Sequence, residues 1–237
     1  TPNRDGIIQR KELNFALGQS IVFSEAGSSS ESVAVDLKGT IDAKGERLWD
    51  LSTAYAKPRR VIDEILAVPG SWYGSYFPKA SYASTLDRTS DSLAVHKVTD
   101  TELSMLGWVS LKANVSKVEY DTPLIMMKFP LKVGVKWTST GTGTGTVSGL
   151  PLYRASETYD FEVDAKGKLK TLTGTYPVVR LRLNFTQQQY SPTMWKRTRI
   201  VYFFVAECYG VIGKVESELY EIKNEFTKAV LVKRQSD

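Results

Sequence analysis

The chain has 237 residues, of which 42% are hydrophobic and 24% are charged, so its composition is that of a globular protein and not of a disordered one. The formal net charge is +5, and the basic residues occur in short, scattered groups instead of on one element, so we expect no nucleic-acid partner. Cys208 is the only cysteine and His96 the only histidine, which excludes an intramolecular disulfide, a cysteine-based metal cluster and a metal site with two histidine ligands. No stretch approaches the ~18 apolar residues of a transmembrane segment.

Residues 1–12 can be aligned with a calcium-binding loop that uses oxygen atoms of Asn3, Asp5 and Glu12. Thr1 stands where such loops begin with aspartate, and the helices that flank this motif are missing or poor. The alternative is an exposed turn that leads into a strand or short helix. Residues 27–30, GSSS, form a loop. We therefore divide the chain into an N-terminal segment and loop, 1–32, and a single β-rich domain, 33–237.

The next segments give one strand and one helix. Residues 33–41 alternate apolar and polar side chains, which predicts a half-buried strand. Residues 58–68, PRRVIDEILAV, predict a helix with Val61, Ile62, Ile65 and Leu66 on one face, bounded by Pro58 and by Pro69-Gly70. We expect this helix to cover one end of a sheet.

An aromatic group follows at Trp72, Tyr73, Tyr76, Phe77 and Tyr82. Such side chains bury large apolar areas, so they can line a ligand cleft or pack in a core or at a sheet edge. Both interpretations stay open on the sequence.

From residue 91 onward, the sequence predicts strand after strand. Residues 93–98 and 102–109 predict a hairpin, and 165–168 predict a turn. The segment 124–149 predicts a strand, a corner near Gly134, and a second strand that starts at the buried anchor Trp137 and continues into an alternation of Thr and Gly. Further strands are expected at 116–120, 158–163, 179–185, 200–205 and 211–222. The predicted fold is mainly β: an antiparallel curved sheet, half-barrel or sandwich with one or two short helices.

Three of these segments resemble a loose group of uncharacterised bacterial exported proteins and lipoproteins. FPLKVGVKW (129–137) resembles the P-L-x-V-G-x-x-W strand of that group. Residues 173–176, TGTY, resemble its G-T-F/Y strand, and Ala206, Gly210, Gly213 and Val215 approximate its A-x-x-x-G-x-V turn. The resemblance implies a protein of the bacterial cell envelope, periplasmic or anchored to the outer membrane by lipid through a removed N-terminal segment. It also implies a sheet curled over an apolar interior, similar to lipoprotein-carrier proteins.

The sequence carries no catalytic motif. No G-x-S-x-G elbow is present, and the Thr/Gly run 141–146 lacks the lysine and the helix of a phosphate loop. His96 lies on an alternating strand, and Cys208 has no neighbouring base. Glu216, Glu218 and Glu221 fit a solvated strand face as well as acid–base chemistry. We therefore predict a non-enzymatic protein without cofactor or metal.

Two sets of residues suggest binding. Arg180 and Arg182 share one face of a strand, and Lys196, Arg197 and Arg199 lie at the start of the next, so a hairpin could gather these cations around an anionic group. The alternative is a charged outer face whose partners include Asp160 and Glu162. Apolar contacts with a ligand are assigned to four aromatic residues: Trp72, Tyr76, Phe77 and Trp137.

The leading hypothesis is an exported bacterial β-protein that binds a lipid or another apolar or amphiphilic ligand. The alternative is a structural or interaction module at the cell surface that meets a cell-envelope component. A third hypothesis is a calcium-binding surface protein.

Overall fold

The computed structural model describes residues 3–86 and 91–237, and 58% of these residues are in β-strands. The one helical element among them is a 3-10 turn, η1 (Arg10–Glu12). No helix in these ranges has the length and apolar character needed to cross a membrane. The strands are β1 (Ser20–Ala26), β2 (Val33–Ala34), β3 (Thr40–Ile41), β4 (Arg47–Asp50), β5 (Arg59–Leu66), β6 (Tyr82–Thr85), β7 (Ser92–Val98), β8 (Glu102–Ser110), β9 (Lys117–Lys128), β10 (Lys136–Val147), β11 (Leu150–Lys170), β12 (Thr175–Ser191), β13 (Trp195–Ala206), β14 (Gly210–Ser217) and β15 (Lys228–Gln235).

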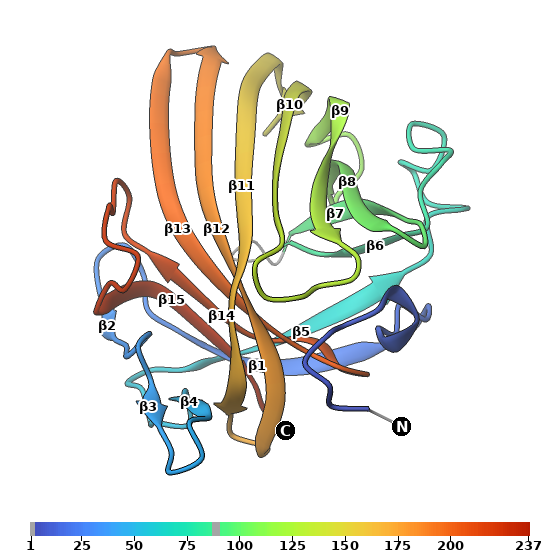
Figure 1. The fold of residues 1–237 in the computed structure, drawn as a ribbon. Helices are drawn as coiled ribbons and strands as arrows, with labels where there is room; N and C mark the ends of the chain where they lie inside the picture. The colour runs from blue at the N-terminus through green and yellow to red at the C-terminus, as the bar shows by residue number, and fades with distance from the viewer. Residues whose placement is uncertain (1–2, 87–90) are drawn as a thin grey trace.

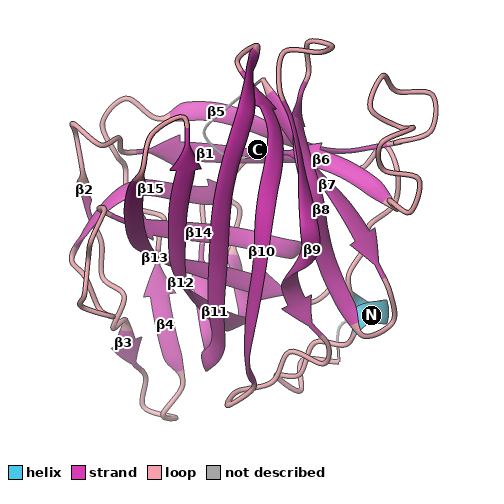
Figure 2. Ribbon diagram, turned by 90° about the horizontal axis from the view of Figure 1, so that it is seen from above, coloured by secondary structure: helices cyan, strands magenta, loops and turns pink. Residues whose placement is uncertain are grey.

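Twelve of the described strands close into an antiparallel barrel (Figure 1). Strands β5 to β15 follow one another around the wall in chain order, each paired with the next. β1 fills the remaining gap, since Phe23 is opposite both Val61 of β5 and Gln235 of β15. In Figure 2, β10 to β13 lie across from β1, β5 and β15, which run crosswise to them. β1 belongs to residues 1–32, so this part of the N-terminal segment lies within the wall.

The predicted mainly-β, antiparallel fold is confirmed, but the sheet is a closed barrel instead of a curved sheet, half-barrel or sandwich. The helix predicted at 58–68 is wrong. This segment is β5. Val61 and Asp63 are opposite Phe23 and Ile21 of β1. The backbone N–H of Ile65 donates to the carbonyl oxygen of Gln19 at 2.9 Å. The apolar spacing fitted a helix, but pairing with β1 on one side and β6 on the other requires an extended backbone.

Other segments also differ from their predictions. Residues 33–41 form only the two short strands β2 and β3, which pair with the start of β15 and with β4, while Val35 and Leu37 between them pack on the outer face of the barrel. The turn predicted at 165–168 is continuous strand, since β11 runs through it while pairing with β12 and then, in parallel, with β4. The hairpin of β7 and β8 and the strand–corner–strand of β9 and β10 are confirmed.

The alternation of Thr and Gly in β10 has a steric cause. Gly141 and Gly143 are buried on the inner face, while Thr140 and Thr144 are exposed. A Cβ on Gly141 would lie 2.3 Å from the carbonyl oxygen of Thr122, and one on Gly143 would lie 2.8 Å from Val118 Cγ1. Because β9 packs so closely on this face, only glycine fits there.

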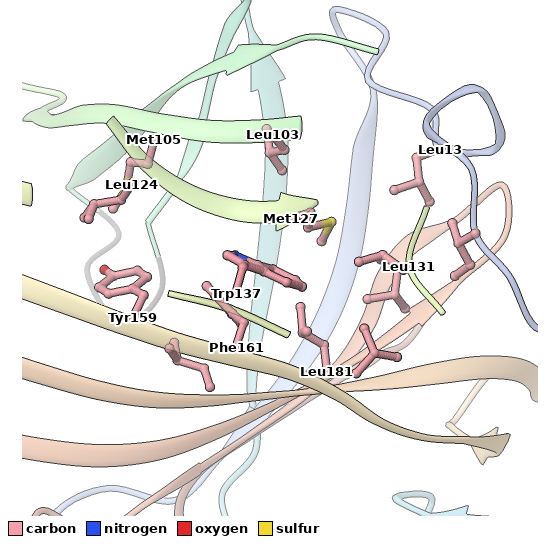
Figure 3. Close-up of a cluster of buried hydrophobic side chains, with 14 of the residues drawn as sticks. Leu13, Leu103, Met105, Leu124, Met127, Leu131, Trp137, Tyr159, Phe161 and Leu181 are labelled. Carbon is pink, nitrogen blue, oxygen red and sulfur yellow. The ribbon is translucent and has the colours of Figure 1, made fainter. Parts of the chain in front are cut away.

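Apolar side chains fill much of the barrel interior (Figure 3). Trp137 of β10 stacks on Phe161 of β11 with ring centroids 4.9 Å apart, and its Nε1–H donates to the carbonyl oxygen of Ile125 at 3.0 Å. The surrounding strands and the N-terminal segment contribute Leu13, Leu103, Met105, Leu124, Met127, Leu131, Tyr159 and Leu181.

The outer face of β12 to β15 is also buried, because residues 33–55 cover it. Trp49 and Leu37 are fully covered there, and Trp49 packs edge-to-face on Phe204 at 5.2 Å. Arg180 holds this cover in place. It forms a two-pronged ion pair with Asp164, with both N–O distances 2.9 Å, and its Nη1 donates to the carbonyl oxygen of Leu37 at 2.5 Å.

We expect Arg180→Met to lower the free energy of unfolding by about 3–5 kcal/mol, because it leaves the carboxylate of Asp164 buried without its partner. The matched control is Arg182→Met on the same face of β12. Its partner Glu162 is more exposed and keeps an ion pair with Lys136, so the expected loss is about 1 kcal/mol or less. Urea denaturation measures both variants. Equal losses would show that Arg180 does not fasten the cover.

Candidate functional site

The barrel interior contains a cavity of about 450 Å³. Eight-stranded barrels are filled by side chains or hold one small ligand, and the enclosed space grows with strand number, so twelve strands leave room inside. The volume lies within the roughly 300–1,000 Å³ of small-molecule sites. The cavity is therefore the candidate site.

Most of the cavity wall is apolar. It is built by inward side chains of β6 to β9 and of β12 and β13, including Met105, Met127, Leu183, Val201 and Phe203. The N-terminal segment adds Leu13 and Phe15, and the Phe15 ring stacks on that of Tyr82 at 5.6 Å. Such a wall suits a hydrocarbon chain or ring.

A charged patch interrupts this wall on β14, β15 and β5. Lys214 and Lys233 occupy directly opposed positions on β14 and β15, and their side chains are only 13% and 4% exposed. Lys233 Nζ lies 2.5 Å from Asp63 Oδ2, and Lys214 Nζ lies 3.8 Å from Glu216 Oε2. Glu216 also forms an ion pair with Arg199. Four of these side chains line the cavity: Asp63, Lys214, Glu216 and Lys233.

The inward direction of the charged side chains follows from the alternation of side chains along each strand, because the outer face of β14 and β15 is buried under residues 33–55. On β14, Val215 points to the outer cover, so its neighbours Lys214 and Glu216 point inward. Glu25 of β1 is opposite Lys233 and forms an ion pair with Arg59 at 2.6 Å. Buried charges are costly unless they are paired, and like charges directly opposite each other in a sheet are destabilising. The opposed lysines are thus a costly arrangement that apolar residues could have replaced.

His96, on β7, lines the same cavity. Its Nε2 is 3.1 Å from Ser84 Oγ, its ring is 4.9 Å from that of Tyr82, and its Nδ1 has no hydrogen-bond partner among the described residues. Burial lowers the pKa of His96 to about 4, so the ring is neutral at pH 7.

A second polar cluster surrounds Glu157 inside the barrel. Its Oε2 accepts hydrogen bonds from the hydroxyls of Tyr120 at 2.9 Å and Tyr159 at 3.1 Å, and its Oε1 accepts one from Gln187 Nε2. Burial raises the pKa of Glu157 and, with the nearby carboxylate, raises the pKa of both tyrosines. Tyr159 connects this cluster to the cavity wall.

The structure distributes the predicted aromatic site residues over two places. Trp137 is part of the interior core beside Tyr159. Trp72 and Phe77 pack in a separate cluster with Val68 and Tyr73, formed by the loop that covers β6 to β8. Tyr76 of this loop is 45% exposed, and Lys117 Nζ lies 3.3 Å from its ring centroid. The four residues do not form one cleft.

The predicted arginines are likewise on opposite faces of the wall. Arg180 and Arg182 point outward, where they pair with Asp164 and Glu162. Arg199 is opposite Phe185 on β12, so it points inward to Glu216. The hairpin of β12 and β13 exists, but it does not gather these three cations.

Sequence reasoning missed Lys214, Lys233, Asp63 and His96 as a group. A signal was present: each lysine interrupts a run of apolar residues, VIGKVES (211–217) and AVLVKRQ (229–235). In a strand that is buried on both faces, a lysine is expected only where it has a partner.

The N-terminal oxygen atoms proposed for calcium are engaged with the chain itself. Asn3 Nδ2 donates to Glu12 Oε1 at 2.9 Å, while the backbone N–H groups of Gln9 and Ile7 donate to Glu12 Oε2 and Asp5 Oδ1, both at 2.7 Å. Thr1 lies outside the described residues. Within them, no group of three or more His, Cys, Asp and Glu side chains is placed to hold a metal ion. Cys208 is exposed in the turn between β13 and β14.

Comparisons with protein-family models, with curated proteins and with solved structures found no match. The relationship to the exported proteins that residues 129–137, 173–176 and 206–215 resemble therefore stays a prediction.

We expect His96 to make stability depend on pH. Its folded-state pKa is about 4 and its unfolded value is near 6.5, so the unfolded chain takes up the proton first as the pH falls. Stability is full above pH 6.5 and declines between pH 6.5 and 4, by up to roughly 3 kcal/mol. The measurement is urea denaturation across this range for the wild type and for His96→Gln. The difference between the two isolates the histidine from the carboxylates, and a difference that does not change with pH would contradict the assignment.

Proposed function

We propose that the protein is a non-enzymatic carrier or receptor that holds one amphiphile inside the barrel, with a hydrocarbon portion against the apolar wall and an anionic group at Lys214 and Lys233. The observation that carries this proposal is the pair of lysines directly opposed on β14 and β15, Lys233 buried and Lys214 partly buried, at one side of an otherwise apolar cavity.

The size and lining of the cavity support an amphiphile. A volume of about 450 Å³ accommodates a single-chain molecule and not a polymer. Met126 and Met127 line the wall among Leu and Phe side chains, and the flexible thioether side chain of methionine adapts to ligands of different shape.

The charges support an anionic group. Around the two lysines lie the cation Arg199 and the carboxylates Asp63 and Glu216. The buried Glu25, opposite Lys233, pairs with Arg59, whose side chain is 58% exposed. An anion near the two lysines would offset their mutual repulsion, and charge interactions are stronger in a partly buried site than in water. A carboxylate, sulfate or phosphate group fits this requirement.

The surface-module hypothesis has less support. Closure of the barrel leaves β10 paired with both β9 and β11, so the Thr/Gly strand offers no open edge for a partner strand. We place the carrier in the bacterial cell envelope, which is what the resemblance of residues 129–137, 173–176 and 206–215 implies.

Filling the cavity is expected to abolish binding. Ala94 lies on the wall, so Ala94→Phe places a ring in the space. We expect the affinity for the fluorescent fatty acid 11-(dansylamino)undecanoic acid to fall at least about tenfold, as measured by fluorescence titration.

Thr138→Phe, on the exposed outer face of β10, should bind like the wild type. Val211→Phe is a second filling variant if Ala94→Phe fails to fold. A folded filling variant that keeps full affinity, or a wild type that does not bind the probe, would contradict the proposal.

The lysines are expected to select the ligand by charge. Lys214→Met and Lys233→Met should each weaken binding of dodecanoate about tenfold, because a charged hydrogen bond contributes roughly 1.5–3 kcal/mol. Binding of dodecanol, which has the same chain and no charge, should change less than about twofold. Isothermal titration calorimetry measures both ligands, with Lys136→Met on the outer face as the control. Equal losses for both ligands would point to a damaged cavity instead of a lost anion contact.

A further inference from the structure

Exposed apolar side chains gather at one end of the barrel, on the tips of neighbouring hairpins. Leu150 and Leu152, in the β10–β11 hairpin, are 65% and 78% exposed. Met194, between β12 and β13, is 78% exposed, and Leu111, between β8 and β9, is 51% exposed. Large apolar residues this exposed on several adjacent tips are uncommon and mark contact surfaces.

These tips are neighbours in the structure as well as on the wall. The backbone N–H of Gly149 donates to the carbonyl oxygen of Val115 at 2.8 Å, which joins the β10–β11 tip to the β8–β9 loop. Arg154 of β11 is opposite Ser191 of β12, and its guanidinium carbon lies 5.8 Å from the ring centroid of Tyr190. Figure 1 shows β11, β12 and β13 extending together to this end of the barrel.

The same tips are basic. Residues 122–156 and 165–206 contain no Asp or Glu, so the β10–β11 and β12–β13 hairpins carry no acidic side chain near their tips. Lys112, Arg154 and Lys196 are exposed there, and none of them forms an ion pair with another described residue within 4.0 Å.

Acidic residues mark the limits of this surface. Asp91 lies beside Leu111, whose backbone N–H donates to the Asp91 carbonyl oxygen at 2.7 Å. Glu119 is paired with Lys117 at 2.8 Å. The neighbouring loop between β14 and β15 carries Glu218, Glu221 and Glu225.

We propose that this end of the barrel, defined by Leu111, Leu150, Leu152 and Met194 with the cations Lys112, Arg154 and Lys196, docks on a membrane surface that contains anionic lipids. Separate, convex tips can each insert an apolar side chain among lipid head groups, whereas a stable protein interface needs a continuous face of roughly 800 Å² per partner. The cations then lie at the level of the lipid phosphates, and their charge complements an anionic leaflet. This inference does not depend on whether the cavity holds a ligand.

The test is flotation of the purified full chain with two kinds of vesicle, phosphatidylcholine alone and phosphatidylcholine with 30% phosphatidylglycerol. We expect the wild type to float with the anionic vesicles, at least about fivefold more than with neutral ones, and to be released at 0.5 M salt because screening weakens the charge contacts. The double variant Leu152→Ser/Met194→Ser should reduce flotation about tenfold.

The matched control is Leu172→Ser, which alters an exposed leucine in the β11–β12 turn at the opposite end of the barrel, and it should float like the wild type. Thermal denaturation checks that each variant is folded. Four results would overturn the proposal: no flotation of the wild type, equal flotation with both vesicles, full flotation of the double variant, or equal loss in the Leu172→Ser control. Sedimentation that shows a wild-type dimer and a monomeric double variant would assign the tips to a second copy of the chain instead.

Discussion

Closure of the sheet by β1 is the constraint on which the rest of the structure depends. The strands from β5 to β15 form one continuous antiparallel meander, and its two end strands meet only through β1, which pairs with β5 and β15 at the same time. Without it, two long edges would be open to solvent and to other chains. The strand that closes the barrel comes first in the chain and one of its partners last, so the fold depends on contacts far apart in sequence, which form slowly.

Closure at twelve strands also explains the interior. Side chains cannot fill so wide a barrel completely, and here the remaining space has an apolar wall with one charged patch. The polarity and burial of the outer face differ from one set of strands to another. It is polar on β10 and β11, and it is buried under residues 33–55 along β12 to β15. Arg180 points outward and binds this outer layer to the wall, while Lys214 and Lys233 point inward and line the cavity. The role of a cationic side chain thus depends on the face of the wall that it occupies.

The cavity and the hairpin tips are separate features with a common chemistry. Both combine exposed or accessible apolar groups with lysine and arginine, and both suit molecules that have a hydrocarbon part and an anionic part. An amphiphile carrier that docks on an anionic membrane would use the two features in sequence, first to reach its source and then to hold its cargo. The polar cluster at Glu157 stands between them within the barrel, since Tyr159 touches the cavity and Gln187 lies on β12 toward the tips.

The sequence by itself determined the class of secondary structure and most strand positions, because alternation of apolar and polar residues is a local property that needs no knowledge of partners. It also located Trp137 as a buried anchor and the corner before it. It did not determine β5, since Val61, Ile62, Ile65 and Leu66 fit a helix as well as a strand, and only pairing with β1 decides between them. It did not determine the binding residues either. Whether Arg199 shares a face with Arg182 or opposes it depends on the register of β12 against β13, and a shift by one residue reverses the answer. Register, closure and the layer outside the wall are set by tertiary contacts, so only the structure could show which charges lie inside the barrel.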